Sequence, residues 1–132
     1  MKAFELQIVT PDREVFNGQA ESVLVPTSEG VIEILAGHID YMAAIVIGKI
    51  RVTSASQDRL AACSDGFMTV SGGSVRIVCT TFEFADEIDV ERANTAKEKA
   101  EQRLATKLDE RTEKLVKAKL MRALNRIRIA EL

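Results

Sequence analysis

The 132-residue sequence has no tryptophan, one tyrosine, one histidine, two cysteines and two prolines. With a single histidine, a zinc site or a catalytic triad is a poor interpretation, because both need several suitably spaced partners. No window approaches the roughly 20 apolar residues of a membrane-spanning helix, and the N-terminus lacks the apolar core of a signal peptide. We therefore expect a cytosolic protein without direct membrane insertion.

The two cysteines, Cys63 and Cys79, lie in alternating apolar segments and lack CxxC spacing. We interpret them as reduced core residues rather than as a disulfide or a redox pair. Nucleic-acid binding is also disfavoured, because aromatic residues are few and the N-terminal part of the chain is acidic.

Charge is divided unevenly along the chain. Residues 1–87 contain 6 Lys/Arg and 12 Asp/Glu, a balance of −6, whereas residues 88–132 contain 12 and 8, a balance of +4. The apolar pattern changes at the same place. We therefore predict two domains, 1–87 and 88–132, and a basic tail that meets a partner or ligand of opposite charge.

Residues 1–87 alternate between apolar and polar residues in short runs, which is typical of strands with one buried face. Turn signals such as Asn17-Gly18, Asp65-Gly66 and Gly72-Gly73 separate the runs. The runs are Phe4/Leu6/Ile8, Val23/Val25, Ile32/Ile34, Ile45/Ile47, Ile50/Val52, Leu60/Ala62, Met68/Val70 and Val75/Ile77/Cys79. Eight or more short strands without intervening helices predict an antiparallel β-sandwich, and hence an α+β chain overall.

The segment TSEGVIEILAGHID, residues 27–40, brings Glu29, Glu33, His38 and Asp40 close together in sequence. Two interpretations stay open for it: a solvated acidic loop, or a docking edge for another subunit.

From Asp89 onward, apolar residues recur every three or four positions, which predicts two amphipathic helices. Asp89 and Asp109 are suitable N-caps. The expected apolar stripes are Ala93, Ala96, Ala100 and Leu104 on the first helix, and Val116, Leu120, Ala123, Leu124 and Ile127 on the second, near 111–130.

The connector ATKLDER contains neither Gly nor Pro. A continuous helix through it would rotate the second stripe by about 140° from the first, which favours a break and a folded hairpin. Because these residues also tolerate a helix, straightening costs little, and we predict a tail with a folded and an extended state.

Four cations suggest an anion site in the folded hairpin. Arg92 and Lys99 on the first helix could converge with Arg122 and Arg126 on phosphate oxygens. The alternatives are solvated cations or ion pairs that hold the hairpin, whereas interspersed acids and the absence of Trp disfavour membrane-surface binding.

Along its whole length the chain resembles the epsilon subunit family of bacterial F-type ATP synthases. The resemblance rests on FELQIVTPDREVF, SEGVIEILAGH, DGFMTVSGGSVRI and FEFADEIDVERANTAKEKAEQRL, in this order. The family's nucleotide signature matches Ile88, Asp89, Arg92 and Ala93. Arg122 and Arg126 match its paired arginines, and Glu83 matches an acidic position before the signature. Lys99 stands where nucleotide-binding members usually carry Arg, and Ala36 and Asp40 replace common prolines.

The resemblance implies a ten-stranded sandwich followed by a helical hairpin, and a non-catalytic rotor subunit at the cytoplasmic face of the membrane. The implied partners are gamma and the c-ring, with alpha and beta when the tail extends and inhibits hydrolysis. ATP is the implied regulatory ligand, with the part of Mg²⁺ left open, and a purely structural rotor subunit is the alternative. The expected docking residues are Ser28, Glu29, Gly30, Glu33 and His38.

Overall fold

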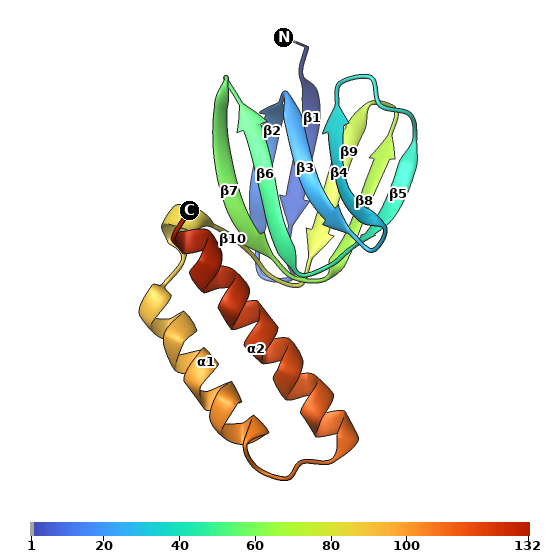
Figure 1. Cartoon of the computed structure of the whole chain (residues 1–132). Helices are drawn as coiled ribbons and strands as arrows, with labels where there is room; N and C mark the ends of the chain where they lie inside the picture. The colour runs from blue at the N-terminus through green and yellow to red at the C-terminus, as the bar shows by residue number, and fades with distance from the viewer. Residues whose placement is uncertain (1) are drawn as a thin grey trace. The chain divides into compact units, whose positions relative to one another are not determined.

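The computed structural model describes residues 2–132, which form two compact units. The first unit ends at Phe84 and the second runs from Ala85 to Leu132, so the division falls three residues before the end of the expected first domain, residue 87. The first unit is built from strands and the second from helices (Figure 1).

The first unit is the predicted antiparallel β-sandwich of about ten strands. Its strands are β1 (Phe4–Val9), β2 (Glu14–Ala20), β3 (Ser22–Thr27), β4 (Gly30–Leu35), β5 (Tyr41–Ile45), β6 (Gly48–Ser54), β7 (Gln57–Cys63), β8 (Gly66–Ser71), β9 (Ser74–Cys79) and β10 (Phe82–Phe84). They follow the order β10-β7-β6-β3-β5-β8-β9-β1-β2, with β4 paired to β3. All pairs are antiparallel except β1 with β9.

Period-two alternation sets the core of this sandwich. Leu6, Ile8, Ile50, Met68 and Ile77 are among the fully buried side chains, and their neighbours in sequence point outward. The apolar runs of the sequence therefore predict the buried face of most strands correctly.

Two turn and strand predictions in this unit are wrong. Asn17-Gly18 lies inside β2 rather than in a turn, and Gly18 pairs with Leu6 of β1. β2 is the last strand of the sheet path and only Ala20 in it is fully buried, so it lacks the apolar alternation that identifies a strand. Ile45 and Ile47 do not share a strand, because Ile45 ends β5 and β6 begins at Gly48.

The second unit contains a short 3₁₀-helix, η1 (Ala85–Glu87), and two α-helices, α1 (Val90–Leu104) and α2 (Glu110–Ala130). The helices pack against each other as an antiparallel hairpin (Figure 1). Asp89 caps α1 and Asp109 caps α2, each with its side chain accepting a backbone N–H, so both cap predictions and the break between the helices are confirmed. Hydrogen bonds from Thr112, above all from its side chain, lower the pKa of Asp109.

The cysteines are free thiols buried in the sandwich core. The Cys63 thiol donates to the Val46 carbonyl over 3.6 Å. Its hydrogen bond with Cys79, together with burial, raises the pKa of Cys63 well above its usual range. The thiol therefore stays protonated through neutral pH.

This shift predicts a stability change at alkaline pH. Because the Cys63 pKa is higher in the folded than in the unfolded chain, the free energy of unfolding should not depend on this thiol below about pH 8.5. It should then fall by up to about 1.4 kcal/mol per pH unit as the unfolded thiol ionises. Urea unfolding at pH 7.5, 8.5 and 9.5 measures the slope, and Cys63→Ala should flatten it. Equal slopes in both chains would contradict the assignment.

Candidate functional site

The helix hairpin is held by small side chains. Ala93 and Ala100 of α1 are buried, as are Val116 and Ala123 of α2, and each pair is separated by two helical turns. Only residues 105–109 separate the helices, so α1 and α2 pack antiparallel with these buried residues in the hairpin interior. The expected stripe on α1 needs one correction: Ala96 is exposed and Lys97 is half-buried, so the buried face is rotated toward Lys97.

Three of the four predicted cations lie toward the same end of the hairpin. Arg92 is in the first turn of α1, and Arg122 and Arg126 are in the second half of α2, which runs antiparallel to α1. Lys99 lies seven residues, about 10.5 Å, further along α1 from Arg92.

The four cations also share a side of the hairpin. At 100° per residue, Arg92 and Lys99 project about 110–130° from the buried stripe of α1, and Arg122 and Arg126 about 80–120° from that of α2, in the same rotational sense. Because the helices are antiparallel, side chains rotated from the buried stripes in the same sense lie on the same side of the hairpin. Arg92 and Lys99 are exposed and Arg122 is half-buried, and within residues 2–132 none of these three forms an ion pair.

The other signature residues surround the start of α1. The Asp89 carboxylate accepts the Arg92 backbone N–H over 3.0 Å, so one of its oxygens has a structural role. Ile88 is half-buried just before this cap, and Ala93 lies in the helix interface. Glu83 belongs to β10 of the first unit, where it pairs in register with Ala62, whereas the other seven predicted nucleotide residues belong to the second unit.

The predicted docking residues are not brought together. Ser28, Glu29 and Gly30 form the turn between β3 and β4, where the Thr27 hydroxyl donates to the Gly30 carbonyl and accepts from the Glu29 N–H. His38 lies in the loop after the other end of β4. Six strand residues span roughly 20 Å, so these positions mark two separate ends of the strand.

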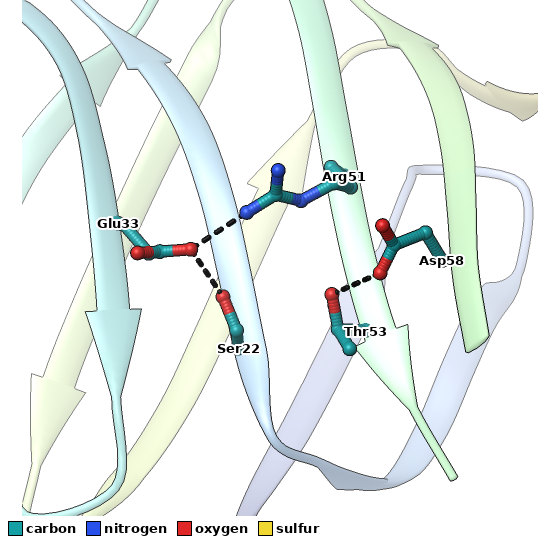
Figure 2. Close-up of polar contacts among 5 residues, drawn as sticks. All are labelled: Ser22, Glu33, Arg51, Thr53 and Asp58. Atoms are coloured by element: carbon teal, nitrogen blue, oxygen red, sulfur yellow. Dashed lines mark hydrogen bonds and ion pairs between the residues drawn. The ribbon is translucent and has the colours of Figure 1, made fainter. Parts of the chain in front are cut away.

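Glu33 has a partner within its own sheet that the sequence does not reveal. Its carboxylate accepts from the Arg51 guanidinium at 2.6 Å and from the Ser22 hydroxyl at 2.8 Å, as Figure 2 shows. Thr53, near Arg51 on β6, donates to Asp58 of β7 in the same way. The Glu33–Arg51 pair follows from the register of β4, β3 and β6, which places Glu33, Leu24 and Arg51 in one row across the sheet. Glu33 therefore stabilises the sheet surface.

Among residues 2–132 there is no group of three or more His, Cys, Asp or Glu side chains arranged to hold a metal ion. In the same part of the chain, no helix is both long and apolar enough to cross a lipid bilayer. A shallow hollow of about 400 Å³ lies over β1, β2, β8 and β9, and its lining includes Glu5, Gln7, Asn17 and Arg76.

A β-sandwich followed by a pair of long helices is a two-domain architecture that two family models match. The first, the beta-sandwich domain of the ATP synthase delta/epsilon chain, covers residues 3–85. The second, its long alpha-helix domain, covers residues 86–131. The chain belongs to the ATP synthase delta/epsilon chain family. Within this family it is similar to the epsilon chains of bacteria.

Bacterial relatives match the chain from end to end. The ATP synthase epsilon chain of Ruminococcus albus is 38% identical over 131 residues, and that of Bacillus velezensis is 39% identical over 130, each covering 98% of both chains.

Two solved structures share the fold. A chain in the Euglena gracilis mitochondrial ATP synthase structure, titled OSCP/F1/c-ring, superposes with a TM-score of 0.76 at 23% identity, over 90% of this chain and 76% of the other. A chain in the Tetrahymena thermophila central stalk/c-ring structure gives 0.67 at 14% identity, over 96% and 95%.

Proposed function

We propose that this chain is a non-catalytic central-stalk subunit of a proton- or sodium-translocating F-type ATP synthase, bound to gamma and to the c-ring at the cytoplasmic face of the membrane. Its membership of the epsilon family over both domains carries this proposal. The central-stalk and c-ring titles of the structures with the same fold support the choice of partners. Docking uses the turn Ser28–Gly30 at one end of β4 and His38 at the other.

The hairpin regulates ATP hydrolysis by changing between two states. In the folded state its small-residue interface is closed, as in this structure. In the extended state α2, which carries +5 over residues 111–132 (7 basic, 2 acidic), reaches alpha and beta subunits and obstructs hydrolysis. Exposed Leu115, Met121 and Leu124 provide apolar contacts for that second position.

ATP stabilises the folded state because the hairpin gathers its cations only when closed. Arg92, Lys99, Arg122 and Arg126 bind phosphate oxygens, whereas Asp89 and nearby backbone groups face the base. A ligand that binds only the closed state stabilises it by RT ln(1 + [L]/Kd), about 2.7 kcal/mol at a 100-fold excess over Kd. Falling ATP then releases the tail.

A purely structural rotor subunit is the second candidate, and specific observations favour it. Asp89 already accepts a helix-cap hydrogen bond, and Glu83 and Arg126 already interact with other groups of the chain. In this alternative the same residues hold the folded structure and no nucleotide binds.

An ATP titration of the isolated chain, with and without Mg²⁺, separates the two candidates. Arg122→Ala should weaken binding at least about tenfold, because it removes charge-assisted hydrogen bonds to phosphate. Lys99→Arg should strengthen ATP binding, because a guanidinium group can bind a phosphate group through two parallel hydrogen bonds. Isothermal calorimetry gives the affinities.

Lys114→Ala is the matched control for this titration. It removes one positive charge from the same helix, about 12 Å from Arg122 along the axis, and should leave the affinity within twofold. Equal affinity for the Arg122→Ala and unmodified chains would remove Arg122 from the site. No binding at millimolar ATP would favour the structural subunit.

A further inference from the structure

The loop that carries His38 is tied to a second loop of the sandwich. Residues 36–40 connect β4 to β5, and Gly72-Gly73 forms the turn between β8 and β9. The Asp40 carboxylate accepts the Gly72 backbone N–H over 3.1 Å. This bond joins two segments that are 32 residues apart in the sequence.

The strand register explains why these loops meet. Tyr41, the first residue of β5, pairs with Val70 near the end of β8, so Asp40 naturally lies beside the turn that follows β8. That turn is closed by Ser71 and Ser74, and both of its glycines have positive φ, 58° and 82°. The Gly72 N–H lies outside the strand ladder, and Asp40 supplies its acceptor.

His38 is held from both sides within this loop. Its backbone N–H donates to the Leu35 carbonyl over 3.3 Å, which fixes the start of the loop. Its ring makes an edge contact with Tyr41, with centroids 5.8 Å apart. Ile39, between His38 and Asp40, leaves 77% of its surface exposed. Without the Asp40 bond, the second half of the loop would keep the His38–Tyr41 ring contact and the 2.7 Å contact between His38 Nδ1 and the Ile39 carbonyl oxygen. Neither of these ties the loop to the β8–β9 turn.

We propose that Asp40 is a positioning residue for subunit docking: by clamping the His38 loop to the β8–β9 turn, it presents His38 and Ile39 to the rotor partner in one orientation. The inference rests on the docking role proposed for His38. A loop held in its bound conformation loses less conformational entropy on association, and the partner therefore binds more tightly. The bond itself is exposed and adds little to the stability of the sandwich.

The first test asks whether the clamp exists in solution. Amide exchange of Gly72, followed by NMR in the intact chain, should accelerate in Asp40→Ala. In Asp40→Asn the side-chain carbonyl can still accept the same N–H, so protection should persist. The melting temperature of both variants should stay within a few degrees of the unmodified chain. Unchanged Gly72 exchange in Asp40→Ala would overturn the proposal.

The second test measures rebinding of each variant to synthase depleted of this chain. Asp40→Ala should weaken binding about three- to tenfold, the effect of one lost hydrogen bond, and Asp40→Asn should bind within twofold of the unmodified chain. Asp12→Ala, which removes one exposed carboxylate from another turn, should have no effect.

His38→Ala separates the two levels of the argument. Weaker binding of His38→Ala with unchanged binding of Asp40→Ala would refute the positioning role alone. Unchanged binding of His38→Ala would refute docking through this loop, and the inference with it.

Discussion

Removing residues 88–132 should raise the ATP hydrolysis rate of the assembled synthase severalfold. The truncated chain keeps the whole first unit, which ends at Phe84 and carries the proposed docking residues. It loses the basic α2 helix, which in the proposed extended state lies between alpha and beta. Hydrolysis is measured after the depleted synthase is reconstituted with either chain, and gel quantification verifies equal incorporation. Unchanged hydrolysis at equal incorporation would count against regulation by the tail.

A reversible lock tests the same switch in the full-length chain. Ala93 of α1 and Ala123 of α2 are both buried in the hairpin, so a disulfide between cysteines at these positions, in the double variant Ala93→Cys/Ala123→Cys, should keep the hairpin closed. The oxidised synthase should hydrolyse ATP at the high rate of the truncated form, and reduction should restore inhibition. The native thiols are buried and do not compete. If oxidation has no effect on hydrolysis, opening of this interface is not the regulatory step.

Gly66→Ala should destabilise the sandwich by about 3 kcal/mol or more. An added Cβ would lie 1.8 Å from the Val78 carbonyl oxygen and 2.8 Å from the Cys79 Cα, where β8 and β9 meet. Both neighbours are backbone atoms, so no side-chain rotation relieves the overlap. Urea unfolding followed by circular dichroism should show a lower midpoint, or a chain that does not fold at all.

Gly18→Ala is the matched substitution for this test. Its added Cβ would meet only the Phe16 ring, at 3.7 Å, which is ordinary van der Waals contact. The stability should stay unchanged or rise slightly, because alanine reduces the conformational freedom of the unfolded chain. Equal unfolding midpoints for the two variants would show that β8 and β9 do not approach so closely at Gly66.

The sequence predicts the buried parts of this fold better than its edges. Strands such as β1 and β9 bury one face and therefore carry a clear apolar alternation. The edge strand β2 has a single fully buried residue and β10 has only three residues, so neither has a periodic signal. In the hairpin, Asp89 and Asp109 could be identified because an N-cap is a local feature, decided by residues within one turn.

The candidate sites show the same limit. That Arg92, Arg122 and Arg126 lie on one side of the hairpin follows from helical periodicity once the helices are aligned. The pairing of Glu33 with Arg51 depends on the register of three strands, which local sequence does not encode. For the same reason, the sequence does not show that the Ser28–Gly30 turn and His38 lie at opposite ends of β4.

The interface between α1 and α2 includes several small side chains. Ala93, Ala100, Val116 and Ala123 are buried, and each helix has its own aspartate cap. Because a methyl group buries little apolar surface, separating the helices at these positions costs less than opening an interface of large side chains. In the proposed function, an anion held by the cations of both helices therefore favours the closed state.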